Sequence, residues 1–134
     1  MDKKLNILFI SGWYPNRLMP TLGNFVQKHA EAVALHCNVA AVHACSDANC
    51  KGELEITGQM INNVFTVNVY YKKITHSIPI LSQVQKLLAY KNAFKMGIEQ
   101  VQKRFGKIDV VHHNILYPSG IIALHLKKKF RIPY

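Results

Sequence analysis

The chain has 134 residues, enough for one domain whose core buries roughly two-thirds of the surface of the unfolded chain. Its hydrophobic content of 49% against 18% charged residues excludes a disordered chain, and no apolar run approaches the roughly 20 residues of a membrane span. The formal net charge of +10 points to anionic partners, with a solvated basic face as the alternative that we prefer for most of the lysines. We do not expect such a partner to be nucleic acid, because the sequence lacks a zinc finger, an RNA-binding signature and interleaved aromatic and basic residues.

The first half of the chain alternates between strand and helix patterns. The nearly continuous apolar run Lys4–Ile10 predicts a strand covered on both faces. Apolar residues at helical spacing then predict a helix from Leu22 to Val33. Buried strands are predicted at Cys37–Ala44 and Val64–Tyr71. The polar segment Cys45–Asn63 between them is interpreted as a loop, with room for a short strand at "LEIT".

The second half continues the alternation. A long helix is predicted from about Ser82 to Phe105, with basic residues in its last turn and a glycine just beyond. A buried strand, "KIDVVHH", and a helix over Pro118–Phe130 follow, the proline lying in the first turn. "RIPY" then resembles the start of one more strand.

Alternating strands and helices predict parallel βαβ units joined by right-handed crossovers. We therefore expect an α/β protein with a Rossmann-like three-layer α/β/α fold. Its mainly parallel sheet should be doubly wound, with the first strand central. Residues 1–134 are interpreted as one domain that is incomplete at its C-terminus and belongs to a longer protein.

The three cysteines, Cys37, Cys45 and Cys50, are odd in number and irregularly spaced. Neither a disulfide framework nor a zinc site is indicated, and reduced thiols are typical of the cytoplasm. We assign no metal ion and no cofactor, and we expect a cytoplasmic protein.

Two segments leave strand ends and enter helices, which is where ligands bind in open α/β sheets. In the first, Ser11–Gly23, the unpaired amides of a helix start favour an anion, and Gly23 would let a phosphate approach the backbone. The alternative is that this glycine only permits tight packing. The second, His112–Gly120, offers imidazole, amide and phenol groups that can hydrogen-bond a sugar. The alternative there is that one histidine only completes the strand and that "PSG" only opens the helix.

The stretches "ILFISGWYPNRLMPTLGNFVQKHAEAV" and "IDVVHHNILYPSGIIALHLKKKFRIPY" together resemble the N-terminal domain of retaining GT-B glycosyltransferases. This group, which includes the group 1 or family 4-like enzymes, acts on nucleotide-diphospho sugars. The resemblance covers both ends of the chain, and the middle is similar only in its strand and helix pattern.

The resemblance implies that this domain receives the acceptor and that the loop before the first helix faces the donor diphosphate. It places Gly23 and Asn24 at the phosphate-facing turn. Residues of both loops would line the acceptor side of the cleft: Trp13, Tyr14, Arg17, His112, Asn114 and Tyr117. The aromatic residues of the first loop could equally be core residues.

The implied function is transfer of a sugar from a nucleotide-diphospho sugar to a glycan or lipid-linked acceptor in cell-surface polysaccharide biosynthesis. The family's "EH" motif and its acidic donor-binding pattern would lie beyond Tyr134. No catalytic residue is therefore assigned, and we expect the chain alone to show no transfer. The alternative function is a non-catalytic Rossmann-like module that binds an anion or a partner.

A further expectation concerns the inner face of an anionic membrane. The basic block "LKKKFR", Leu126–Arg131, predicts peripheral, salt-sensitive attachment there. The alternative is that these lysines keep the helix end soluble and interact with the helix dipole.

Overall fold

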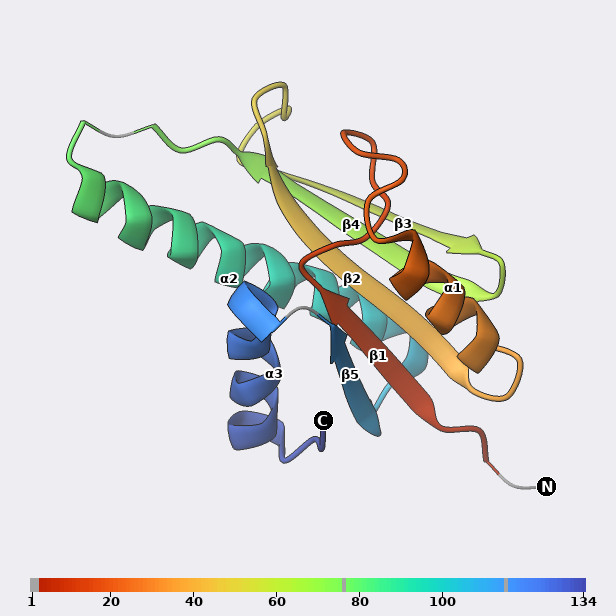
Figure 1. Cartoon of the computed structure of the whole chain (residues 1–134). Coiled ribbons are helices and arrows are strands. Elements are labelled where there is room, and N and C mark those ends of the chain that lie inside the picture. Colours follow the sequence, from red (N-terminus) through yellow and green to blue (C-terminus); the bar gives the residue numbers. More distant parts are fainter. Residues whose placement is uncertain (1–2, 76, 115) are drawn as a thin grey trace.

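The computed structural model describes residues 3–75, 77–114 and 116–134, with the side chains of residues 116 and 117 outside the description. Helices and strands alternate along the chain (Figure 1). Their bounds are β1 Asn6–Ser11, α1 Asn24–Val33, β2 Asn38–Asp47, β3 Leu54–Ile61, β4 Val64–Lys72, α2 Pro79–Phe105, β5 Val110–Asn114 and α3 Leu116–Phe130.

The strands form a five-stranded sheet in the order β3-β4-β2-β1-β5. Strands β4, β2, β1 and β5 are parallel, and β3 pairs antiparallel with β4 at the edge. Strand β1 lies between β2 and β5, so the order reverses there. The Rossmann-like fold with a mainly parallel, doubly wound sheet is therefore confirmed.

Helices cover both faces of the sheet. One face packs against α2 and α3 and buries Leu8 and Ile10 together with Phe94 of α2. The other face packs against α1 and buries Phe9 with Val26. Successive residues of β1 thus point to opposite layers, which explains why its sequence is an unbroken apolar run.

The expected loop Cys45–Asn63 is wrong over most of its length, although the short strand allowed at "LEIT" coincides with the start of β3. Strand β2 continues to Asp47, and β3 occupies Leu54–Ile61 in a hairpin with β4. The turn consists of Asn62 and Asn63, with φ of 49° and 68°. Asparagine tolerates positive φ at both positions of a two-residue hairpin turn, so "NN" was the available signal.

Smaller differences lie at element ends. Helix α2 begins at Pro79, where proline fits the first helical position, and β5 extends to Asn114. His112 and Asn114 are therefore strand residues, and because α3 already begins at Leu116, most of the expected loop His112–Gly120 lies in β5 and α3. "RIPY" is not a strand, yet the Pro133 carbonyl accepts a hydrogen bond from the Val111 N–H at 2.8 Å.

Candidate functional site

The site is built where the strand order reverses. Ser11 and Asn114, the last residues of β1 and β5, are paired neighbours in the sheet. The chain leaves β1 for α1 on one face and leaves β5 for α3 on the other. Diverging connections of this kind leave a crevice at the carboxyl ends of parallel strands, the usual ligand position in such sheets.

The segment between β1 and α1 folds around the buried side chain of Asn16. Its Oδ1 accepts hydrogen bonds from the N–H groups of Leu18 and Met19 at 3.0 and 3.1 Å. Its Nδ2 donates to the Tyr14 carbonyl at 2.9 Å. A polar side chain that satisfies three backbone groups fixes a loop without regular secondary structure.

His43 on β2 holds this loop through hydrogen bonds with Ser11 and Asn16. Its Nδ1 lies 3.1 Å from the Ser11 carbonyl, and its Nε2 lies 3.4 Å from Nδ2 of Asn16. The carbonyl can only accept, so Nδ1 carries the proton and Nε2 accepts from Asn16. Burial lowers the pKa of His43 below its ordinary 6.5, against an opposing hydrogen bond to Ser11. The imidazole is therefore a neutral structural link.

Arg17 ties the same loop to the strand ends. Its guanidinium binds Asp47 of β2 at 2.7 Å and Glu55 of β3 at 3.0 Å, and it lies over the Tyr70 ring of β4. Hydrogen bonding to Arg17 is the main cause that lowers the pKa of Glu55 from 4.5 to about 2. The observed role of Arg17 is thus to hold the loop, and its contact with an acceptor stays a prediction.

The two adjacent aromatic residues of the loop have different environments. Trp13 is 48% exposed, whereas Tyr14 is 2% exposed and belongs to the cluster under α1. Burial raises the pKa of Tyr14 to about 12. The Tyr14 side chain is a core residue, and of the pair only Trp13 is open to a ligand from solvent.

Gly23 precedes α1 in a left-handed conformation with φ of 68°. A Cβ there would lie 2.6 Å from the Trp13 carbonyl carbon and 2.9 Å from the Tyr14 nitrogen. The glycine is thus required for packing whether or not a ligand binds. Asn24, the first helical residue, is exposed, and no side chain caps this helix start. The phosphate-facing role of both residues stays a prediction.

The end of β5 presents an unsatisfied donor. The Nδ2 atom of Asn114 is buried and has no hydrogen-bond partner among the described residues. The Asn114 carbonyl accepts a hydrogen bond from the Ser119 hydroxyl at 3.2 Å, which ties the strand end to α3. A buried amide without a partner is costly, and a ligand hydroxyl could satisfy it. The side chain of Tyr117 lies outside the described residues.

His112 lies on the α1 side of β5 in a cluster of rings. Its ring centroid is 4.6 Å from that of Phe9 and 4.8 Å from that of His29 on α1. Burial, followed by the nearby His29 and His113, lowers the pKa of His112, against an opposing hydrogen bond with the Asn114 side chain. A neutral imidazole at this depth can accept or donate one hydrogen bond, but its position within β5 places it below the strand end.

Sequence reasoning found Trp13, Gly23 and Asn114 at the strand ends but missed the supporting groups. His29 is exposed on α1, yet its ring packs edge-on against that of His112, a contact between elements far apart in the sequence. The role of His43 had a signal, because a histidine within the apolar run "NVAAVHA" must find a hydrogen-bond partner. The contacts of Arg17 had no such signal, since its partners Asp47, Glu55 and Tyr70 are about 30 to 50 residues away in the sequence.

Comparison with known proteins gives a partial similarity. Over 67 residues, which make up 50% of the chain, the sequence is 30% identical to an uncharacterized glycosyltransferase from Methanocaldococcus jannaschii. The aligned stretch covers 18% of that protein's length. No model of a protein family matches the chain, and no solved structure matches it. The similarity supports a glycosyltransferase-like origin.

Proposed function

We propose that the chain is the acceptor-side domain of a GT-B glycosyltransferase. The whole enzyme would transfer a sugar from a nucleotide-diphospho sugar to a glycan or lipid-linked acceptor in cell-surface polysaccharide biosynthesis, in the cytoplasm. The observation that carries the proposal is the partial similarity to a glycosyltransferase. The reversal of strand order between β1 and β5, the usual ligand position in such sheets, supports it, because Trp13 and Asn114 lie at that end of the sheet.

Three of the predicted residues, Trp13, Asn24 and Asn114, would have direct roles. The buried amide of Asn114 would donate to an acceptor hydroxyl, and the exposed ring of Trp13 would pack on the apolar face of a sugar. The N–H groups that begin α1 at Asn24 would face the donor diphosphate.

Trp13 allows a direct test of the acceptor site, because it is the single tryptophan of the chain. Titration with oligosaccharides and lipid-linked sugars should change its fluorescence. Asn114→Ala should weaken binding by about tenfold, since one buried hydrogen bond is lost. Asn49→Ala, at an exposed residue after β2, is the matched control. Unchanged fluorescence with every glycan, or equal affinity for Asn114→Ala and wild type, would refute the acceptor role.

Asn24→Asp tests the phosphate-facing helix start. A carboxylate there should stabilise α1 slightly through the helix dipole, yet it should repel a nucleoside diphosphate. Calorimetric titration with uridine and guanosine diphosphates would measure the affinity, and thermal unfolding would measure the stability. Because the two effects have opposite signs, general destabilisation cannot imitate the expected result. Equal nucleotide affinity in both proteins would count against the role.

A further inference from the structure

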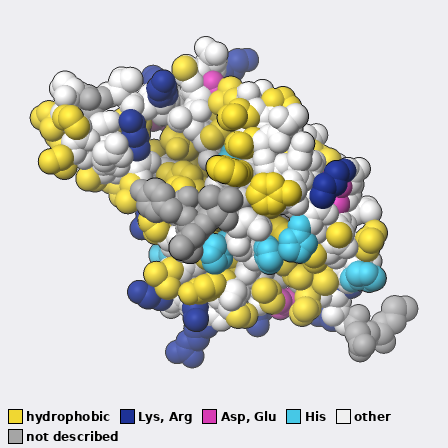
Figure 2. Space-filling model, in the orientation of Figure 1, with side chains coloured by type: hydrophobic (Ala, Val, Ile, Leu, Met, Phe, Trp, Pro, Cys, Tyr) yellow, Lys and Arg dark blue, Asp and Glu magenta, His cyan; other side chains and the backbone are white. Residues whose placement is uncertain are grey.

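Helix α2 has a second apolar face that the sheet does not cover. Its start projects beyond the sheet (Figure 1), and hydrophobic side chains gather there with basic ones beside them (Figure 2). Five of these side chains follow helical spacing and form what we name the α2 stripe. They are Ile80, 76% exposed, Leu81, 45%, Val84, 51%, Leu87, 38%, and Leu88, 60%. Exposed apolar side chains gathered in one place mark an interaction surface.

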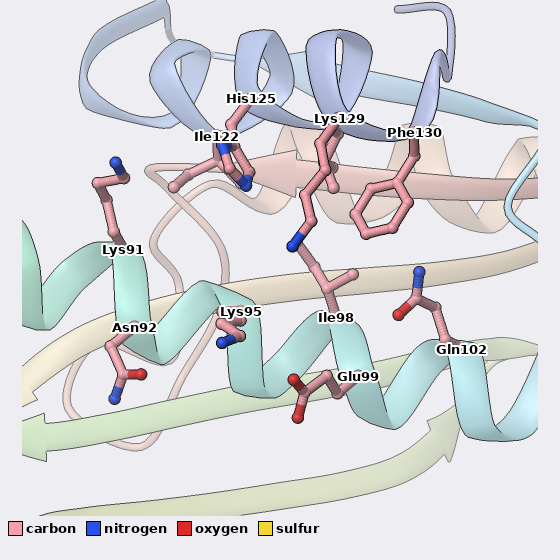
Figure 3. Close-up of a pocket in the computed structure, with 11 residues that line it drawn as sticks. Lys91, Asn92, Lys95, Ile98, Glu99, Gln102, Ile122, His125, Lys129 and Phe130 are labelled. Carbon is pink, nitrogen blue, oxygen red and sulfur yellow. The ribbon is translucent and has the colours of Figure 1, made fainter.

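The α2 stripe continues into a basic groove. Lys91 follows Val84 by seven residues and Leu87 by four, and Lys95 follows Leu88 by seven, so all lie on one face of the helix. There α2 and α3 enclose a cavity of about 320 Å³, the α2–α3 groove (Figure 3). Its apolar lining is Ile98, Ile122, Leu126 and Phe130, and its basic lining is Lys91, Lys95, His125 and Lys129.

The charge around these two features has one sign. Residues 79–98 of α2 contain three lysines and neither aspartate nor glutamate. Glu99 is the acidic side chain that lines the α2–α3 groove. Within the described part of the chain, no ion pair engages Lys91, Lys95 or Lys129. These ammonium groups are therefore available to an external anion.

We propose that the α2 stripe and the α2–α3 groove together form a binding surface for a bilayer that contains anionic phospholipid. The apolar side chains of the stripe enter the acyl boundary, and the groove lysines reach the headgroup phosphates on flexible stems. None of the helices in the described part of the chain could span a bilayer. The surface thus combines Lys129, which belongs to the basic block Leu126–Arg131 on α3, with Lys91 and Lys95 of α2.

Charge argues against a second copy of the chain as the occupant. Pairing two α2 stripes would bring the lysines of two chains together, each chain carrying a net charge of +10. Like charges at a shared interface oppose association, whereas an anionic bilayer attracts both copies.

The surface also bears on the substrate, in a step that rests on the proposed function. Helix α2 begins at the carboxyl edge of the sheet, the edge that the loop before α1 also leaves (Figure 1). A lipid-linked acceptor held in the same bilayer would thus be presented to the end of the molecule where Trp13 and Asn114 lie.

The test is cosedimentation of the chain with two kinds of vesicle, phosphatidylcholine alone and phosphatidylcholine with an equal amount of phosphatidylglycerol. We expect salt-sensitive binding to the anionic vesicles only. A variant with Leu87→Ser and Leu88→Ser should bind roughly tenfold more weakly. Leu35→Ser, at a side chain 69% exposed after α1, is the matched control. Binding should fall by about fivefold for each groove lysine changed to glutamine.

Lysines outside the groove provide the charge control: Lys3→Gln, Lys51→Gln and Lys107→Gln. Equal losses in the control and groove variants would show non-specific attraction and overturn the proposal. A dimer by analytical ultracentrifugation that Leu87→Ser dissociates, without vesicle binding, would also overturn it. So would binding of glycerol phosphate without vesicle binding. Because vesicle binding and the fluorescence of Trp13 with glycans are separate measurements, either proposal can fail while the other stands.

Discussion

The segment between β1 and α1 and the start of α2 both expose apolar side chains at the carboxyl edge of the sheet, yet they are held in opposite ways. The first is fixed by Asn16, by Arg17 and by close contact at Gly23. The second presents Ile80 and Leu88, 76% and 60% exposed, on a helix whose start projects beyond the sheet. The difference teaches that exposure alone does not define a site. A loop fixed by buried polar groups can position a ligand, whereas an uncovered stripe suits a surface without a defined shape.

The largest expected effect is that of Gly23→Val. The new side chain would meet the Trp13 backbone in a conformation that disfavours any Cβ, so we expect a loss of about 3 kcal/mol or more in unfolding free energy. Urea denaturation is the measurement. Gly52→Ala is the control, because its φ is 77° but no atom lies within 4 Å of the new Cβ. It should lose only about 1 kcal/mol. Equal losses would show that conformation, and not the close contact, makes Gly23 necessary.

Asn16→Ala should have the next largest effect. It leaves two N–H groups and the Tyr14 carbonyl without their partner, which should cost about 2 to 3 kcal/mol. Asn114→Ala removes an amide whose Nδ2 lacks a partner and should cost less than about 1 kcal/mol. Chemical denaturation of both variants sharpens the contrast between a structural and a ligand-facing asparagine. If the order were reversed, the loop would not depend on Asn16.

The acid sensitivity of the loop should depend on Arg17. Unfolded Glu55 takes up its proton near the ordinary pKa of 4.5, but in the folded protein the pKa is about 2. The stability that this pair contributes is therefore complete above pH 4.5 and is lost as the pH falls toward 2. Arg17→Met should reduce the loss in this range. Buried His43, whose pKa is lowered from 6.5, acts at higher pH, because the unfolded state gains its proton first below 6.5.

Urea unfolding at a series of pH values from about 7.5 to about 3 would separate the two ranges. In Arg17→Met the fall just below pH 6.5 should persist, and only the fall below 4.5 should shrink. A variant whose acid profile overlays that of the wild type would show that the ion pair with Glu55 does not stabilise the folded loop.

The smallest effect on stability is expected at the α2 stripe. Leu88→Ser, at a side chain already 60% exposed, should change the unfolding free energy by no more than about 0.5 kcal/mol. The same change should weaken vesicle binding. At the α2 stripe a substitution therefore alters binding without altering stability, whereas at Gly23 the main expected effect is on stability. A clear loss of melting temperature would instead show that the stripe packs against part of the protein.

Sequence alone determined the layered α/β fold. A parallel strand buried on both faces must be an apolar run, and a helix that packs on a sheet must place apolar residues every three to four positions. It also identified the two strand-end segments, since unusual residues between a strand and a helix mark them. It anticipated only the first half of β3, at "LEIT", because the polar, half-exposed residues of this strand lack that pattern and its pairing depends on a two-asparagine turn.

Only the tertiary structure decided which residues of those segments are structural and which are open. Trp13 and Tyr14 are adjacent and chemically similar, yet one faces solvent and the other the core. Arg17 finds its partners on two strands that approach only when the sheet assembles. The α2 stripe follows ordinary helical spacing, and sequence cannot say whether such a face is covered. Burial depends on what packs against a residue, and that is set by contacts between elements far apart in the chain.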